Sequence, residues 1–293
     1  MSKRLAILNP CSGQFKSPGF EKRWLPELRE LVDDVVFTDA EGSATRIARE
    51  SADYDGFVVV SGDGTILEVI VGMQRERQHL VTIPTGRGNC LARDLGIKTV
   101  ADGLTALQSG GVTRIDLMQA DIEFKDGSHR SFLSASTIAL GYVVSVVERA
   151  SNFHAAGPYG YAVATLLTPP LSFRCRLGIN NGDDEDRTCT GIVINNTVNL
   201  ANFPAFKKAD LHDGLIDLLL LEAGWWGQTL HNLSILSALG FHEVGDRSQA
   251  TDVRVSLEAP LTLMIDGQLF ADAMTLRVQC LPAALSCRRL AVS

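Results

Sequence analysis

No stretch of the 293-residue sequence comes near the roughly 18 consecutive apolar residues that a membrane-spanning helix needs. The first apolar run, 5–8, is too short for the core of a signal peptide and leads directly into Asn9-Pro10. Positive charge is also in the minority, because 27 lysines and arginines stand against 34 acidic residues and the net charge is −7. Such a chain is a poor general binder of nucleic acid. These absences predict a cytoplasmic protein with no nucleic-acid partner.

Metal-binding and disulfide patterns are missing as well. The six cysteines include no Cys-x-x-Cys pair, and no histidines stand nearby at metal-ligand spacing. A zinc site or a disulfide framework is therefore not expected, and the thiols are predicted to be reduced and mostly buried. Hydrophobic residues make up 45% of the chain and charged residues 21%. This composition is typical of a folded globular protein.

The first third of the chain alternates between short apolar runs and segments with helical periodicity. This alternation, with short connections, predicts an α/β fold with a doubly wound parallel sheet. In such sheets ligands bind at the carboxyl ends of the strands. The predicted strands are 4–8, 35–37, 56–60 and 80–83, and the predicted helices are 20–31, 43–50, 65–77, 89–95 and 100–108.

The pattern changes near residue 113, where short strands separated by turn residues take over. This half is predicted to be mainly antiparallel and to form a β-sandwich. Two helices, at 159–167 and at about 228–239, interrupt it. The predicted strands are 114–124, 130–138, 173–179, 188–194, 216–221, 252–257, 261–265 and 274–280.

The strongest motif is the Gly-Asp-Gly loop, residues 61–65, which joins an apolar strand to a helix. Its glycines let the backbone approach a ligand closely, and the free amides of the following helix face an anion. The loop therefore predicts phosphate binding, with Thr65 as a helix cap or phosphate ligand and Asp63 as an acid beside the phosphates. A tight turn with an Asp cap explains the spacing equally well. A Walker loop and a dinucleotide fingerprint are both excluded, the latter because Leu67 stands where a small residue is needed.

Two further loops follow predicted strands. The Gly-x-Gly loop, residues 84–89, precedes a helix in the same way as the Gly-Asp-Gly loop, so the two are placed to face each other across a nucleotide. The Asn-Pro loop, residues 9–13, ends the first strand. It is a weak signal alone, because Asn-Pro and Ser-Gly are common in turns.

In this order the three loops resemble the catalytic domain of the diacylglycerol kinase family, which includes bacterial lipid kinases and is similar to sphingosine kinases. Later segments agree with the resemblance: 114–117, 157–162, 204–205, 213–217 and 265–267. The match runs from about residue 4 to about residue 290. It implies a nucleotide-binding domain of residues 1–120, to which 281–293 return, and a β-sandwich lipid-substrate domain of residues 121–280.

The resemblance implies transfer of the γ-phosphoryl group of ATP to the hydroxyl of a diacylglycerol- or sphingosine-type lipid, taken from the inner face of a membrane. It implies Mg2+ at Asp213, together with carbonyl oxygens of Asp210 and Leu215, because magnesium prefers hard oxygen ligands. The state of assembly is left open between a monomer and the homodimer common among bacterial relatives. The residues expected at ATP are Asn9, Thr38, Ser61, Gly62, Asp63, Gly64, Thr65, Gly86, Arg87, Gly88 and Asn89.

The sequence departs from the family at two positions that affect chemistry. Gln268 stands where bacterial relatives carry the glutamate assigned as proton acceptor, and an amide is not a useful base near neutral pH. Asp63 is the favoured base instead, as in sphingosine kinases. Arg87 stands where relatives often have threonine, and it either contacts a phosphate or points to solvent. Two alternatives stay open: a sensor that binds nucleotide or lipid without turnover, and a phosphotransferase of the NAD kinase or phosphofructokinase type.

Overall fold

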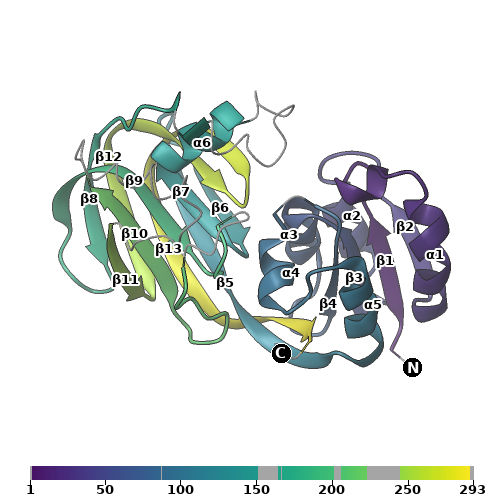
Figure 1. Cartoon of the computed structure of the whole chain (residues 1–293). Helices are drawn as coiled ribbons and strands as arrows, with labels where there is room; N and C mark the ends of the chain where they lie inside the picture. Colours follow the sequence, from purple (N-terminus) through teal and green to yellow (C-terminus); the bar gives the residue numbers. More distant parts are fainter. Residues whose placement is uncertain are drawn as a thin grey trace. The chain divides into compact units, whose positions relative to one another are not determined.

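The structure, a computed structural model, describes residues 2–86, 88–150, 164–165, 167–200, 206–222 and 245–290 (Figure 1). The chain forms two compact units. Unit 1 comprises Met1–Leu117, Thr197–Gly214 and Leu281–Ser293, and unit 2 comprises Met118–Asn196 and Leu215–Cys280. The predicted helix at 228–239 and most of that at 159–167 lie outside the described residues.

Unit 1 is built on parallel strands in the order β4-β3-β1-β2. Strand β13 extends this row, because Ser286 and Cys287 pair in parallel with His79 and Leu80. Strands β3 and β4 are almost fully buried, as expected for a parallel sheet covered on both faces. The predicted α/β class is thereby confirmed. The strands are β1 (Arg4–Leu8), β2 (Asp34–Phe37), β3 (Gly56–Ser61), β4 (His79–Pro84) and β13 (Gln268–Arg289).

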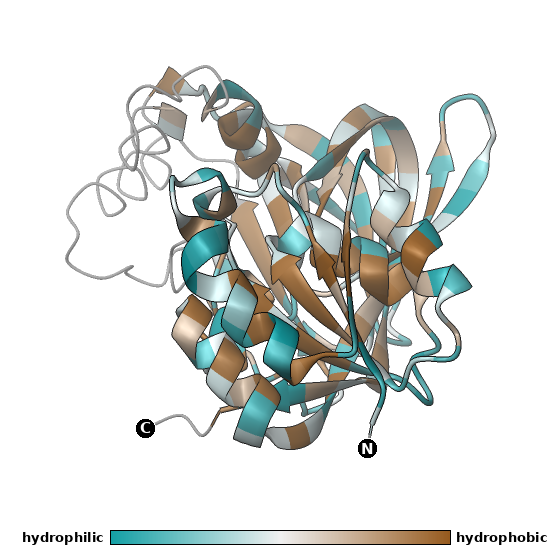
Figure 2. Ribbon diagram, turned by 90° about the vertical axis from the view of Figure 1, so that its right-hand side faces the viewer, coloured by the Kyte–Doolittle hydropathy of each residue, from teal (hydrophilic) through white to brown (hydrophobic). Residues whose placement is uncertain are grey.

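Helices cover both faces of this parallel sheet. Helices α1 (Phe20–Leu31) and α5 (Val100–Ser109) share one apolar core with alternate residues of the strands. Figure 1 shows them on the side opposite to α3 (Asp63–Gly72), and in Figure 2 the strands are largely brown while the helices alternate between teal and brown. The predicted helix 65–77 ends early, at Gly72. A Cβ there would lie 2.3 Å from the Thr45 carbonyl oxygen of α2 (Ser43–Glu50), so only glycine permits this close packing.

Unit 2 is a large antiparallel sheet whose strands share a single apolar core. Side chains at alternate positions point into this core, such as Ile192 and Ile194 or Val253 and Val255. Two elements, α6 (Tyr142–Ala150) and β11, were not predicted. The strands are β5 (Gly111–Phe124), β6 (His129–Ser134), β7 (Thr137–Gly141), β8 (Phe173–Ile179), β9 (Glu185–Asn195), β10 (Ile216–Glu222), β11 (Asp246–Ala250), β12 (Asp252–Ile265) and β13.

The predicted strand 130–138 was wrong as a single element, because Asp266 divides it into β6 and β7. The Asp266 carboxylate accepts five hydrogen bonds of 2.7–3.1 Å from the main chain and hydroxyls of residues 134–137. These donors are turned toward one point and therefore leave the regular ladder. Conversely, the predicted strands 252–257 and 261–265 are one strand, β12, with irregular pairing between them. The six cysteines are reduced thiols and four of them are buried, as predicted.

Candidate active site

The Asn-Pro loop and the Gly-Asp-Gly loop are joined by a side-chain hydrogen bond. Asn9 directly follows β1, and its Nδ2 donates to Thr65 Oγ1 at 2.9 Å. Its Oδ1 accepts the main-chain amide of Cys11 at 2.8 Å, which shapes the turn. Thr38 lies beside them at the end of β2, where its amide donates to the Leu8 carbonyl at 2.9 Å. The structure therefore brings these predicted residues together at the carboxyl ends of neighbouring strands.

The Gly-Asp-Gly loop and the Gly-x-Gly loop touch through their backbones. A Cβ on Gly86 would lie 2.4 Å from the Gly62 Cα, and a Cβ on Gly62 would lie 3.0 Å from the Gly86 Cα. The amide of Thr85 also donates to the Ser61 carbonyl at 3.0 Å. Ser61 is only 1% exposed, so it takes part in the loop mainly through its backbone.

The Asn-Pro loop packs against Thr85, which directly precedes Gly86 in the Gly-x-Gly loop. Thr85 Oγ1 donates to Ser12 Oγ at 2.8 Å in a buried position, and the Gln14 amide donates to the Thr85 carbonyl at 2.7 Å. A Cβ on Gly13 would lie 3.0 Å from that same carbonyl oxygen. The three loops thus form one connected cluster, as their positions after the strands predicted.

Asn89 closes the Gly-x-Gly loop. Its Oδ1 accepts the Gly86 amide at 3.0 Å, and its Nδ2 donates to the Gly86 carbonyl at 2.9 Å. Its φ of 53° lies in the left-handed region, which asparagine tolerates better than most residues. The Asn89 side chain therefore shapes the Gly-x-Gly loop just before α4 (Cys90–Asp94) begins. Arg87 lies outside the described residues.

The N-terminus of α3 offers the open part of this cluster. Asp63 is the first residue of the helix, and Gly62 precedes it with extended backbone. A Cβ on Gly64 would have no heavy atom within 4 Å, so a ligand has room to approach the first turn. Free amides and the positive end of the helix dipole favour phosphate at such a point. The residues present fit the phosphates of a nucleotide.

The turn that carries Asp210 and Asp213 is fixed from β5. The buried Asp116 donates its amide to the Leu211 carbonyl at 2.7 Å, and its carboxylate accepts the amides of Gly214 and Ala283, both at 2.7 Å. His212 bonds Asp210 through Nδ1 at 2.9 Å, and its Nε2 lies 2.9 Å from the Thr113 hydroxyl. His212 thus stabilises the turn.

This turn presents oxygen donors of the kind that magnesium prefers. Asp213 is exposed, and Leu215 directly follows Gly214, whose φ is 73°. Within the described residues no three His, Cys, Asp or Glu side chains gather at one point. A few carboxylate and carbonyl oxygens suit Mg2+, which keeps several waters, better than they suit zinc.

Gln268 lies in unit 2, at the start of β13. It pairs with Ile265 across the two-residue turn Asp266-Gly267, whose φ values of 45° and 89° are those of a tight hairpin. The five hydrogen bonds to Asp266 hold this turn, and with it the backbone of Gln268. Asp266 was predicted only as part of a turn. Its many donors could not be read from the sequence, because they lie about 130 positions away.

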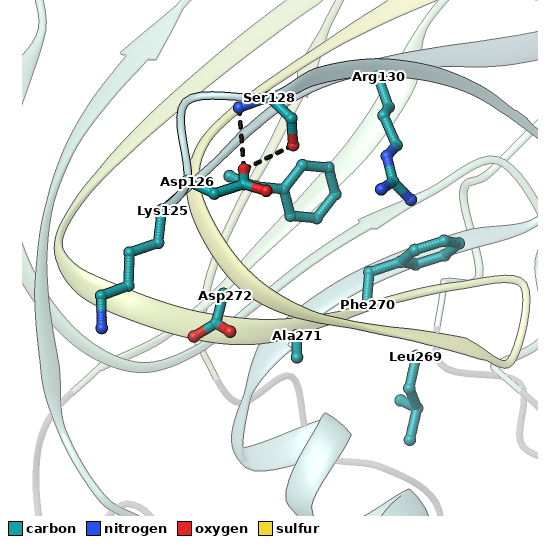
Figure 3. A pocket seen from close by; sticks show the side chains of 9 residues that line it. Lys125, Asp126, Ser128, Arg130, Leu269, Phe270, Ala271 and Asp272 are labelled. Carbon is teal, nitrogen blue, oxygen red and sulfur yellow. Dashed lines mark hydrogen bonds between the residues drawn. The ribbon is translucent and has the colours of Figure 1, made fainter.

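A hollow of about 570 Å3 lies next to Gln268 along the chain but includes none of the predicted site residues. Its walls come from the β5–β6 hairpin and the start of β13, and Figure 3 shows Asp126 of that hairpin accepting two bonds from Ser128. Hydrogen bonding to Ser128 lowers the pKa of Asp126. The hollow is therefore a charged surface feature of unit 2 and forms no part of the loop cluster in unit 1.

Comparison with known proteins agrees with the resemblance that the three loops indicated. The family model of the diacylglycerol kinase catalytic domain matches residues 3–120. A diacylglycerol kinase of Staphylococcus saprophyticus is 27% identical over 290 residues, which cover 92% of this chain and 90% of that protein. Residues 3–120 therefore resemble the catalytic domain of diacylglycerol kinases, and the relatives that match most of the chain are named as lipid kinases.

Two further proteins are similar to this chain over different lengths. Human sphingosine kinase 2 is 27% identical over 190 residues, which cover 56% of this chain and 28% of that protein. The crystal structure of a diacylglycerol kinase from Bacillus anthracis has a TM-score of 0.79 at 20% identity, and the match covers 99% of this chain and 97% of the other. This last likeness concerns the fold alone.

One residue of the matched region, Asp94, was not singled out from the sequence. Asp94 ends α4, and its carboxylate accepts the Val198 amide at 2.6 Å and Asn199 Nδ2 at 3.0 Å. Burial raises the pKa of Asp94, and the like charge of Asp63 adds to that effect, while the two hydrogen bonds oppose it. An acid in a short helix is ordinary in sequence, so nothing marked this position.

Proposed function

We propose that the protein is an ATP-dependent lipid kinase that transfers the γ-phosphoryl group to the hydroxyl of a diacylglycerol- or sphingosine-type lipid. The observation that carries the proposal is the backbone contact of Gly62 with Gly86, which joins two glycine-rich loops beside the open N-terminus of α3. Relatives named diacylglycerol kinase and sphingosine kinase 2 support the lipid acceptor.

The residues of the loop cluster act mainly by position and charge. Phosphoryl transfer asks for alignment and neutralisation of charge more than for covalent help. The amides of the first turn of α3 bind phosphate oxygens, and Gly64 leaves the space for them. Asn9 and Thr65 hold the Asn-Pro loop beside this turn. The cluster thereby orients the triphosphate for attack by the lipid hydroxyl.

A magnesium ion fits the turn fixed by Asp116. Asp213, with carbonyl oxygens of Asp210 and Leu215, would hold it, since these are hard oxygen donors on a turn set by short hydrogen bonds. When bound, the ion neutralises charge on the phosphates. The role of the protein is to keep the turn and its oxygen atoms in place.

Asp63 is the proposed proton acceptor. It is the carboxylate at the phosphate-binding end of α3, whereas Gln268 carries an amide that cannot take a proton at neutral pH. Deprotonation of the lipid hydroxyl by Asp63 raises its nucleophilicity as the γ-phosphoryl group departs from ADP. General-base help of this kind typically contributes roughly 10²–10⁴-fold in rate.

The acceptor reaches the enzyme from a membrane surface. No helix in the described part of the chain is long and apolar enough to cross a bilayer. We propose a cytoplasmic enzyme that meets its lipid at the inner face of the membrane.

Incubation of the purified protein with γ-labelled ATP, Mg2+ and a panel of diacylglycerol, sphingosine, ceramide and long-chain prenol tests the proposal. Label is expected in one lipid class and to be lost with Asp63→Asn. Binding of ATP without label in any lipid would support the sensor, and label in NAD or a sugar phosphate would support the other phosphotransferases. Either result would overturn the proposal of a lipid kinase.

A further inference from the structure

Asp94 links two parts of unit 1 that lie more than 100 positions apart in sequence. It is the last residue of α4, the helix that begins directly after the Gly-x-Gly loop. Both of its carboxylate oxygens are used: Oδ2 accepts the Val198 amide at 2.6 Å, and Oδ1 accepts Asn199 Nδ2 at 3.0 Å. One short helix therefore connects the loop cluster to residues 198–199.

The segment that Asp94 binds also carries the turn with Asp210 and Asp213. Thr197–Gly214 belongs to unit 1 as a separate piece of chain. At its start, the Thr197 hydroxyl donates to the Asn199 carbonyl at 2.9 Å, and the Phe206 amide donates to the Val198 carbonyl at 3.0 Å. At its end, Gly214 is held by Asp116 at 2.7 Å. Asp94 and Asp116 of unit 1 thus bind the two ends of this segment through hydrogen bonds.

Desolvation of the Asp94 carboxylate costs free energy, which suggests that this residue is kept for function. The half-buried Asp94 carboxylate loses part of its hydration, and its two hydrogen bonds recover only part of that loss, since the pKa of Asp94 is raised on balance. The charge of Asp63 contributes to this shift. Carboxylates kept under such conditions are common around active sites.

We propose that Asp94 is a positioning residue of the phosphoryl transfer: by binding Val198 and Asn199 it fixes the segment that carries Asp210 and Asp213 relative to the loop cluster. The inference rests on the proposed function. Asp94 itself touches neither nucleotide nor lipid in this role. It acts through the segment, because a displacement of about 1 Å in a reacting group can cost roughly 10²-fold in rate.

Three variants separate positioning from stability. Asp94→Ala removes both acceptors. Asp94→Asn keeps a carbonyl oxygen for the Val198 amide, and the Asn199 amide can turn to accept from the new NH2 group. Asp102→Ala is the matched control, because the Asp102 carboxylate also accepts two hydrogen bonds, from the main-chain amides of Lys98 and Thr99 at 3.0 and 2.8 Å. Asp102 caps α5 and takes no part in the loop cluster.

We expect Asp94→Ala to lower kcat by about 10–100-fold, the usual effect of removing a partner that orients an active-site group. The KM for ATP should stay within about twofold, because the nucleotide contacts remain, and Asp94→Asn should recover most of kcat. Asp102→Ala should lower the melting temperature with kcat within about twofold of wild type. A loss of kcat in Asp94→Ala no larger than in Asp102→Ala, measured below both melting temperatures, would overturn the proposal.

Hydrogen exchange of residues 196–200, followed by mass spectrometry, tests the hydrogen bonds without turnover. Exchange of the Val198 amide should speed up in Asp94→Ala and stay near the wild-type rate in Asp102→Ala. Unchanged exchange in Asp94→Ala would show that Asp94 does not hold the segment. Should the wild-type protein phosphorylate no lipid, the proposed function fails, while this measurement still decides on the hydrogen bonds of Asp94.

Discussion

Gly62 and Gly86 meet backbone to backbone, so that a Cβ on Gly86 would lie 2.4 Å from the Gly62 Cα. Gly86→Ala should therefore push the two loops apart. Because both groups at this contact are main chain, no side-chain rotation relieves it. We expect loss of ATP binding, measured by calorimetry, together with a lower melting temperature. A Gly86→Ala variant that binds ATP as wild type does would contradict a nucleotide site at this contact.

Gly64→Ala is the matched variant in which protein packing is not disturbed. The new Cβ would meet no heavy atom within 4 Å, and alanine in a helix is favoured over glycine by roughly 0.5–1 kcal/mol. Stability should hold or rise, while affinity for ATP falls because the methyl group takes space meant for phosphate. Unchanged ATP affinity in calorimetry would argue that the phosphates do not approach the first turn of α3.

If Asp63 is the proton acceptor, substitutions at Asp63 and at Gln268 should affect kcat very differently. Asp63→Asn should lower kcat by roughly 10²–10⁴-fold with ATP binding retained. Gln268→Glu should leave kcat within about tenfold, since the base is already present and the two side chains are nearly equal in size. Initial rates with labelled ATP measure both. A gain of several hundredfold in Gln268→Glu would instead mean that the missing carboxylate limits the natural enzyme.

The pKa of Asp94 predicts a pH dependence of stability with a defined sign. Burial raises this pKa, so the native state holds the proton more tightly than the unfolded chain does. The stabilisation that follows is complete below about pH 4, near the unfolded pKa, and is lost as the pH rises through the folded pKa. Asp94→Asn should become more stable relative to wild type as the pH rises from about 4 to 7. Urea unfolding at a series of pH values measures this difference.

Asp126→Asn is the control of opposite sign. Hydrogen bonds from Ser128 lower the pKa of Asp126, so its contribution is present above the unfolded pKa and is lost as the pH falls through the folded one. This variant should lose stability relative to wild type as the pH rises. Parallel trends in the two variants would show that the burial of Asp94 does not govern its titration.

Asp266 should be a major determinant of stability in unit 2. Asp266→Ala leaves five donors without their acceptor, among them the hydroxyl of the fully buried Ser134. Each buried unsatisfied donor costs about 1–3 kcal/mol, so we expect a loss of about 3 kcal/mol or more in urea unfolding. Asp126→Ala, at the exposed turn of another hairpin, should cost much less. Similar losses in both variants would contradict a special role for Asp266.

The sequence predicted those features that depend on neighbours along the chain. Strand β1, helix α1 and helix α2 begin and end where their local periodicity indicated. The three loops were found because glycine and turn residues have direct conformational meaning. That they lie at the same end of the parallel strands followed from the strand–helix alternation.

Features that depend on distant residues were not predicted. Helix α6 carries pairs of valines, and β-branched residues favour strands when read locally. Strand β11 is mostly polar and is a strand because it pairs with β10. Asp94 and Asp266 gained their roles from hydrogen-bond donors about 100 and 130 positions away. No local pattern contains that information.

Strand β13 has a consequence for synthesis of the chain. Its 22 residues pair with β12 at one end and with β4 at the other. A ribosome delivers β4 some 200 residues before Ser286, so the nascent parallel sheet waits with one edge unpaired. Exposed edges of this kind invite pairing with other chains. Slow delivery of β13, or truncation before it, should therefore leave a half-made protein that depends on chaperones and aggregates in their absence.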